Sequence, residues 1–169
     1  LKDYNIAYRQ VDLLETGDFD IPSIDKELRN KPNLIFIQRS KGYAWRDAIS
    51  VYEMGKVISH IKNICPNCTI MVDNCYGEFV EDIEPTEVGA DLMAGSLIKN
   101  PGGGITPTGG YIAGKKSCIE QVAYRLTAPS IGMEVGSYSY GYRLYYQGLF
   151  LAPSTVKNAI KGCILGGYV

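Results

Sequence analysis

The hydrophobic residues of this chain follow two patterns, short continuous runs and stripes at helical spacing. The runs LIFIQ at residues 34–38, TIMVD at 69–73 and DLMAG at 91–95 have the length of buried strands. A glycine-rich loop, PGGGITPTGG, leads into a further candidate strand, YIAG, at 111–114, and residues 4–14 contain another. We therefore expect a sheet with several buried strands.

Segments with helical periodicity separate these runs. Between residues 50 and 64 the apolar positions fall on one helical face. The segment DFDIPSIDKEL predicts a helix start, with Pro22 early and Ser23 as its cap. Two more helices are expected at about 117–126 and 154–169. Helices alternating with strands predict an α/β layer fold with a mostly parallel sheet.

Composition and charge narrow the class of protein. The 169 residues suffice for one domain with a core, and 46% hydrophobic with 21% charged residues is ordinary for a globular protein. A net charge of −1 gives no electrostatic reason to expect nucleic acid or an anionic membrane as partner. No apolar run approaches the ~20 residues of a membrane span. Five scattered cysteines favour a reducing compartment, so we expect a cytoplasmic protein.

The CPNC motif and the single histidine could indicate a metal or redox site, but their sequence context argues against both. Cys65 and Cys68 form the motif CPNC, but a redox pair of this type needs a helix start, and the pair instead follows a helical segment. A zinc site would need two further ligands, whereas the chain has a single histidine, His60, and no second CxxC. We therefore expect a structural loop pair, a histidine on a helix surface and no metal.

Polar residues follow three of the predicted strands. Arg39 comes after the first, Asp73 closes the second, and Ser96 and Lys99 follow the third. In open α/β sheets, ligands bind beyond the carboxyl ends of the strands. Any one of these residues alone is commonly a solvated loop residue, an N-cap or a turn former. Together they predict a site that combines a carboxylate, a guanidinium, a hydroxyl and an amine.

This set of groups suits one cofactor in particular. A lysine forms a Schiff base with an aldehyde when its amine is deprotonated. Pyridoxal phosphate is such an aldehyde, and it needs a Schiff-base lysine and an acidic partner for its pyridinium nitrogen. A serine just before the lysine can donate a hydrogen bond to the phosphate. The residues thus point to pyridoxal phosphate bound between Asp73 and Lys99.

The segments DNCYGEF and GADLMAGSLIKNPGGGITPTGGYIAGKK, with IFIQRSKGYAW, RLTAPSIG and YQGLFLAP, carry a family resemblance. They resemble pyridoxal-phosphate enzymes of the aspartate aminotransferase fold type. More closely, they are similar to the cystathionine β/γ-lyase-like group that includes the methionine γ-lyase and aluminium resistance proteins. The resemblance implies the large domain of fold type I, a three-layer α/β sandwich with a mostly parallel sheet.

The resemblance assigns roles residue by residue. Asp73 matches the aspartate that pairs with the pyridine nitrogen, and Lys99 matches the Schiff-base lysine, which also moves protons. Ser96 matches a phosphate-binding hydroxyl, and Tyr76 stands where related enzymes keep a tyrosine near the ring oxygen. Cystathionine-lyase relatives have a second hydroxyl directly before the lysine, and here that residue is Ile98.

Two further residues and the domain limits also follow from the resemblance. Arg39 and Ser40 lie where related enzymes reach the face of the cofactor, although no firm role can be assigned to them. Residues 1–152 correspond to part of the large cofactor domain. Residues 153–169 correspond to the start of a helix that leads to a C-terminal domain, so we expect a fragment of a longer protein.

The implied activity is a carbon–sulfur lyase that eliminates a thiol from a small sulfur amino acid such as cystathionine or methionine, by β- or γ-elimination. The alternatives are another pyridoxal-phosphate enzyme, such as an aminotransferase or decarboxylase, and a catalytically silent scaffold. The segment GSYSYGYRLYYQGLF can be an aromatic core or a subunit interface. The resemblance favours the interface, in a homodimer or homotetramer without nucleic acid or membrane partners.

Overall fold

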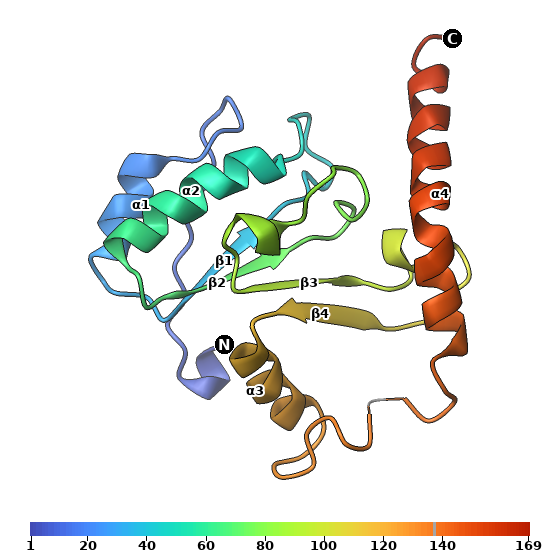
Figure 1. Ribbon diagram of the computed structural model, residues 1–169. Helices are drawn as coiled ribbons and strands as arrows, with labels where there is room; N and C mark the ends of the chain where they lie inside the picture. The colour runs from blue at the N-terminus through green and yellow to red at the C-terminus, as the bar shows by residue number, and fades with distance from the viewer. Residues whose placement is uncertain (137) are drawn as a thin grey trace.

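A four-stranded sheet organises the protein, as the computed structural model shows for residues 1–136 and 138–169 (Figure 1). The strand order is β1-β2-β3-β4, with β1, β2 and β3 parallel and β4 antiparallel to β3. This arrangement confirms the mostly parallel sheet. The strands are β1 Leu34–Gln38, β2 Thr69–Asp73, β3 Leu92–Ser96 and β4 Gly110–Gly114.

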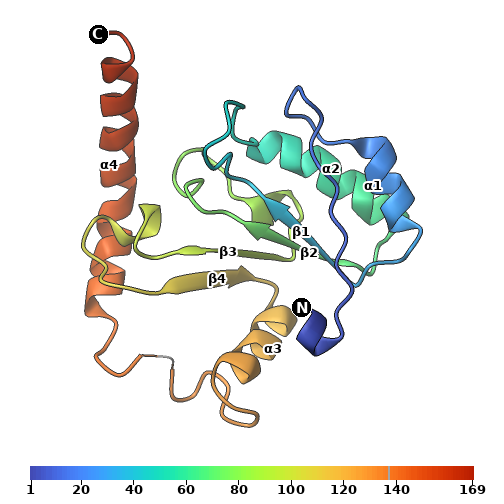
Figure 2. The same cartoon turned by 180° about the vertical axis from the view of Figure 1, so that it is seen from behind.

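Helices α1 (Ile21–Leu28) and α2 (Val51–Ile64) cover one face of the sheet, and Figure 2 shows the same layer from behind. The apolar stripe of α2 packs on the side chains that β1 and β2 direct towards it, which confirms the helix predicted for residues 50–64. Its first turn is closed by a capping box between Ser50 and Glu53. Fully buried members of this core are Val51, Met54, Ile58, Ile61, Ile70 and Val72.

The opposite face of β1 is open. Leu34 and Phe36 point away from α2, and each is 55% exposed. The second layer of helices implied by a three-layer sandwich is therefore absent over β1 among the described residues.

The second half of the chain extends the sheet towards one side. Helix α3 (Lys116–Leu126) follows β4 and confirms the helix expected near 117–126. Helix α4 (Arg143–Gly166) stands at the end of the sheet and contacts the short 3₁₀ helix η3, Asn100–Gly102 (Figure 1). Two other single turns complete the elements, η1 at Lys2–Tyr4 and η2 at Pro85–Val88.

The strand expected within residues 4–14 is wrong. The described structure has a 3₁₀ turn at Lys2–Tyr4 and, beyond it, a single isolated bridge between Leu13 and Phe19. A strand is stable only where a neighbouring strand takes up its backbone hydrogen bonds, and no such neighbour pairs with this segment in the described structure.

Two helix starts also differ from expectation. Asp20, rather than Ser23, caps α1, because its carboxylate accepts hydrogen bonds from the Ser23 backbone N–H (3.1 Å) and hydroxyl (2.6 Å). Helix α4 begins at Arg143 rather than near Ser154, and Pro153 lies inside it. Proline costs a helix one hydrogen bond, and packing of the first turns of α4 against η3 supports the helix through that position.

No helix in the described part of the chain combines the length and the apolar character needed to cross a membrane. All five cysteines are free. Cys65 caps the end of α2 and Cys68 is buried in the core, so the CPNC motif lies in the connection to β2, as expected of a structural loop pair. His60 lies on α2, 37% exposed, and its Nε2 is 2.6 Å from Asp25.

An ion-paired carboxylate joins three elements where β3 begins. The side chain of Asp91 is 5% exposed, and its oxygens lie 2.7 Å from Lys62 Nζ and 2.5 Å from Lys115 Nζ. It also accepts a hydrogen bond from the backbone N–H of Ile70 at 2.7 Å. Burial by itself would raise the pKa of Asp91, but the hydrogen bonds from Lys115, Lys62 and Ile70 outweigh it and lower the pKa.

Replacing this carboxylate should destabilise the fold. We expect Asp91→Asn to lower the free energy of unfolding by about 2 kcal/mol, below the usual cost of breaking a buried pair because Lys115 is largely exposed. The measurement is urea denaturation at neutral pH. A matched control is Glu120→Gln, which removes an exposed carboxylate 3.9 Å from Lys116 and should change stability by less than about 0.5 kcal/mol.

The same pair predicts a dependence on pH. Because the folded-state pKa of Asp91 is below the ordinary value of 3.8, its contribution is complete above that value and is lost as the pH falls through the folded-state pKa. The difference in stability between wild type and Asp91→Asn should therefore shrink in acid. A difference that stayed constant down to acid unfolding would contradict this role.

Candidate functional site

The candidate site lies where β2 and β3 end. Asp73 is the last residue of β2 and Ser96 the last of β3, and parallel pairing places Asp73 beside Ala94 of its neighbour. Lys99 follows in a turn closed by its backbone N–H, which donates to the Ser96 carbonyl oxygen at 3.2 Å. Asp73, Ser96 and Lys99 are all half-buried. The structure thus brings these three predicted residues to one edge of the sheet.

The turn after β2 presents Tyr76. A carboxylate oxygen of Asp73 accepts a hydrogen bond from the backbone N–H of Cys75 at 3.0 Å, which starts the turn. Tyr76 has φ +66, a left-handed conformation that is uncommon outside glycine, and its side chain is 60% exposed. The Nζ atom of Lys99 lies 4.4 Å from the centre of the Tyr76 ring. Lys99 and Tyr76, which the sequence placed in one site, are therefore in contact.

Cys75 is the residue that links the others, and the sequence did not single it out as important. Its thiol interacts with the Asp73 carboxylate, the backbone of Ser96 and the Lys99 amine. Burial raises the pKa of Cys75, and the hydrogen bond with Asp73 raises it further, so the thiol stays protonated at neutral pH. The position of Cys75 two residues after a strand-end aspartate was the available signal.

The contacts of Lys99 determine the protonation of its amine. Burial alone would lower its pKa, but the contacts with Cys75 and Tyr76 outweigh this effect and raise the pKa above the ordinary value of 10.5. Without a ligand, Lys99 is therefore an ammonium at neutral pH. Before the amine can act as a nucleophile, it has to pass a proton to another group.

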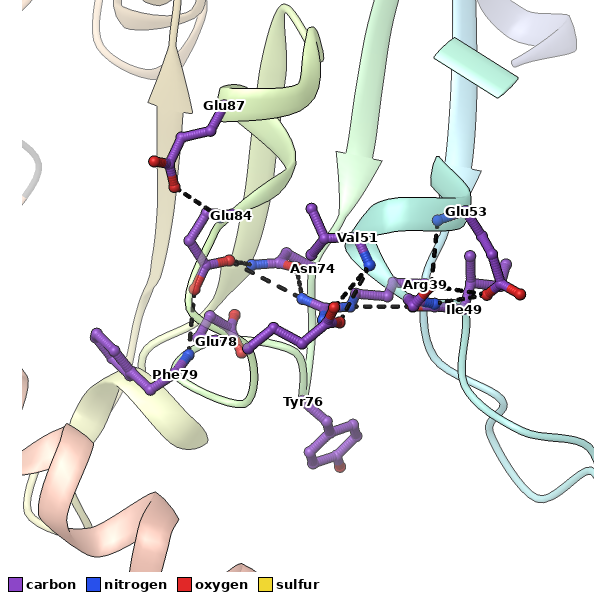
Figure 3. Close-up of polar contacts among 12 residues, drawn as sticks. Arg39, Ile49, Val51, Glu53, Asn74, Tyr76, Glu78, Phe79, Glu84 and Glu87 are labelled. Carbon is purple, nitrogen blue, oxygen red and sulfur yellow. Dashed lines mark hydrogen bonds and ion pairs between the residues drawn. The ribbon is translucent and has the colours of Figure 1, made fainter. Parts of the chain in front are cut away.

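Arg39 directs its guanidinium into the protein (Figure 3). The residue is 3% exposed, and its Nη1 donates to Asn74 Oδ1 at 2.8 Å while its Nε donates to the Ile49 carbonyl at 3.3 Å. Its Nη2 pairs with Glu81, and Nη1 lies 3.9 Å from Glu84. The expected contact of Arg39 with a cofactor stays a prediction.

A second buried carboxylate, Glu78, lies behind the same turn. Tyr111 donates a hydrogen bond from its hydroxyl to Glu78 Oε1 at 2.8 Å, and Asn74 Nδ2 lies 3.4 Å from that hydroxyl. Oε2 of Glu78 has no hydrogen-bond partner among the described residues. Burial raises the pKa of Glu78 and also that of Tyr111. The sequence interpretation missed this network, although the glutamates at 78, 81 and 84 recur every third residue.

Asn100 ties the lysine loop to the turn after β2. Its side-chain amide donates to the Glu78 carbonyl at 3.1 Å and to the Tyr76 carbonyl at 3.3 Å. Because Asn100 directly follows Lys99, these bonds restrict the distance between Lys99 and Tyr76.

Arg39 and Ser40 both lie in the wall of a cavity of about 420 Å³ beside Tyr76. The loop after β1 forms one wall, and Cys75, Tyr76 and Gly77 form the other. A larger hollow of about 550 Å³ lies between residues 16–19 and α2, and none of the predicted site residues lines it. The smaller cavity is therefore the one that adjoins the candidate site.

The chemistry of these groups matches a carbonyl cofactor with an anionic arm. An amine can bond to the carbonyl carbon, a carboxylate can hold a ring nitrogen protonated, and a hydroxyl can donate to the anion. Among the described residues, Lys99 forms no ion pair with a carboxylate, so its amine is not held in a salt bridge. An α/β fold with such residues at its strand ends is the arrangement found in cofactor-dependent enzymes.

Comparison with known proteins identifies the family. A family model described as methionine gamma-lyase matches residues 1–169, and the chain belongs to this family. Among curated proteins, YnbB of Bacillus subtilis is 50% identical over 164 residues, which are 97% of this chain and 39% of YnbB. A protein of Lactobacillus delbrueckii subsp. bulgaricus is 48% identical over 96% of this chain and 53% of its own length. The chain thus spans about half or less of these relatives.

Solved structures agree with this assignment. A carbon–sulfur lyase involved in aluminium resistance from Clostridium novyi superposes with a TM-score of 0.91 at 51% identity, over 97% of this chain and 39% of that one. The methionine gamma lyase CalE6 of Micromonospora echinospora superposes with a TM-score of 0.57 at 20% identity, over 86% of this chain and 36% of that one. The second likeness concerns the fold alone.

The Arg39 side chain packs so closely against Gly77, in the turn after β2, that we expect residue 77 to tolerate no side chain. A Cβ atom at Gly77 would lie 2.6 Å from Arg39 Cδ and still closer to the guanidinium. We expect Gly77→Ala to lower the free energy of unfolding by about 2 kcal/mol, because the buried guanidinium has no room to move.

The matched control is Gly162→Ala near the C-terminal end of α4, where a Cβ meets no atom within 4 Å. That change should raise stability by about 0.5–1 kcal/mol, since alanine favours a helix over glycine. Thermal and urea unfolding of both variants provide the test. Equal effects at the two positions would contradict the close packing of Arg39 on Gly77.

Proposed function

We propose that this protein is a pyridoxal-phosphate-dependent carbon–sulfur lyase acting on a small sulfur amino acid such as cystathionine or methionine. The observation that carries the proposal is the convergence of Asp73, Ser96 and Lys99 at one sheet edge. Membership of the methionine gamma-lyase family supports the reaction class. The likeness to the carbon–sulfur lyase from Clostridium novyi supports it as well.

The residues present suit the cofactor. Lys99 would attach the aldehyde, Asp73 would face the pyridine nitrogen, and Ser96 would donate to the phosphate. Tyr76 would lie near the ring oxygen, and Ser40 would reach the cofactor from the loop after β1. Bound pyridoxal phosphate would supply an electron sink for the bond broken at the substrate Cα. The three-layer large domain of fold type I is the setting proposed for this site.

The reaction then requires side chains of this protein to transfer protons and to stabilise charge. Lys99, once released from the aldehyde by the substrate amine, would take the Cα proton as general base. Asp73, as a carboxylate, would favour a protonated ring nitrogen. The ring of Tyr76 lies 4.4 Å from Lys99 Nζ and would help to orient the amine. The leaving sulfur would take up a proton and depart as a thiol, and one water molecule would hydrolyse the remaining imine to a keto acid and ammonia.

Assembly and location stay predictions of the sequence. We expect a homodimer or homotetramer and a cytoplasmic protein. The aromatic residues proposed for the subunit interface include Tyr140 and Phe150, which are 89% and 84% exposed. Their exposure suits an interface better than a core.

The first test of the proposal is covalent attachment of the cofactor. Purified full-length protein loaded with pyridoxal phosphate should absorb near ~420 nm, as expected for an imine, and should lose this band on borohydride treatment. Lys99→Ala should show no such band, whereas the control Lys116→Ala, which removes an exposed lysine, should retain it. A wild-type protein that stays colourless with added cofactor would refute the assignment.

The second test addresses the role of Asp73 and distinguishes a lyase from an aminotransferase. Asp73→Asn should still bind the cofactor but should release keto acid from methionine, cystathionine or cysteine about 10²-fold more slowly, because the ring nitrogen loses its charged partner. Full activity in Asp73→Asn would contradict the pyridinium role. Amino transfer to an added keto acid without release of ammonia would instead identify an aminotransferase.

A further inference from the structure

Arg39 connects three segments around the candidate site through its backbone. Its N–H donates to the carbonyl oxygen of Asp73 at 3.1 Å, and its own carbonyl accepts from the N–H of Ile49 at 3.3 Å. Residue 39 therefore joins the end of β1 to the end of β2 and to the loop that precedes α2. Both bonds are made by the main chain, so Arg39→Gln and Arg39→Lys keep the groups that form them.

The side chain adds contacts to the turn that follows Asp73. Nη1 donates to Asn74 Oδ1 at 2.8 Å, and the guanidinium lies against Gly77, where it leaves no room for a Cβ atom. Asn74 and Gly77 flank Cys75 and Tyr76 in sequence. Both ends of the segment that presents the thiol and the phenol are thus held by one guanidinium.

The charge of Arg39 is balanced inside the protein. Nη2 pairs with Glu81, whose two carboxylate oxygens each accept from the N–H of Val51 at 3.1 Å, at the start of α2. Glu84 lies 3.9 Å from Nη1 and accepts from Asn74 Nδ2 at 2.8 Å. Figure 3 shows Arg39 between Val51 and Asn74, with the Tyr76 ring directed away from them. The Arg39 side chain is 4% exposed, so loss of its charge would leave these two partly buried carboxylates without their cation.

We infer that Arg39 is a positioning residue, which fixes Asp73 and Tyr76 relative to Lys99 by holding the turn between them. The inference rests on the proposed function in so far as these three residues form the reactive set. Arg39 acts through Asn74 and Gly77 on one side, while Asn100 restrains the same turn from the lysine loop. Together they set the 4.4 Å spacing between Lys99 Nζ and the Tyr76 ring.

The principal experiment is amide hydrogen exchange on the full-length protein without cofactor. In Arg39→Gln the amides of residues 74–81 should exchange about tenfold faster than in wild type, because charge-assisted hydrogen bonds are lost, while those of β4 stay unchanged. Arg39→Lys restores the charge and should recover part of the protection. The matched control is Arg29→Gln, which alters an exposed arginine after α1 and should leave the turn as protected as in wild type.

Other outcomes would overturn the inference. A residue that only contacts the cofactor would leave exchange of the cofactor-free turn unchanged and would lower cofactor affinity alone. A residue that only stabilises the fold would accelerate exchange throughout the sheet, β4 included.

Protein loaded with pyridoxal phosphate provides a second measurement, which would not change if Arg39 only stabilised the fold. The pH midpoint of the ~420 nm band reports the surroundings of the Lys99 imine, and it should shift in Arg39→Gln but not in Arg29→Gln. An unshifted midpoint in Arg39→Gln would count against positioning. If wild type shows no band at all, the proposed function fails, whereas local loss of exchange protection would still establish that Arg39 holds the turn.

Discussion

Parallel pairing of β2 with β3 is the constraint on which the candidate site depends. Because both strands run in the same direction, their last residues, Asp73 and Ser96, reach the same edge of the sheet. The turn that follows β3 then returns Lys99 to this edge through the bond from its N–H to the Ser96 carbonyl. An antiparallel β3 would end at the opposite edge, and the carboxylate and the amine would be separated by the length of a strand.

Burying polar groups near this edge costs desolvation free energy, and a network of hydrogen bonds and ion pairs around Arg39 offsets that cost. Glu78, Glu81 and Glu84 surround a single guanidinium, that of Arg39, so charge alone does not balance. Glu81 gains further stabilisation from the N–H of Val51 at the positive end of α2. Burial raises the pKa of Glu78, which favours its neutral form. The network therefore limits the number of buried charges as well as pairing them.

Two residues at this edge make contacts in the structure that the sequence did not predict. Cys75 looked incidental beside Asp73, yet Asp73 raises the pKa of its thiol and the thiol in turn raises the pKa of Lys99. Arg39 looked like a ligand-binding residue because it follows a strand, yet its guanidinium is buried among protein acceptors. In both cases the direction of a side chain after a strand end decided the outcome, and strand alternation does not extend into turns.

The sequence by itself determined the local elements and the residue types of the site. Continuous apolar runs predicted β1, β2 and β3 closely, and helical periodicity predicted α2, because burial imposes a hydrophobic period that is visible in one dimension. Asp73, Ser96 and Lys99 could be chosen because strand ends in α/β sheets carry ligand-binding groups. The contact between Lys99 and Tyr76, the capping of α1 by Asp20 and the start of α4 at Arg143 were decided by tertiary structure. Tertiary structure also decided the network of Arg39, Asn74 and Glu81. These features join residues that are distant in sequence or compete for one backbone position, so their geometry depends on how the whole chain packs.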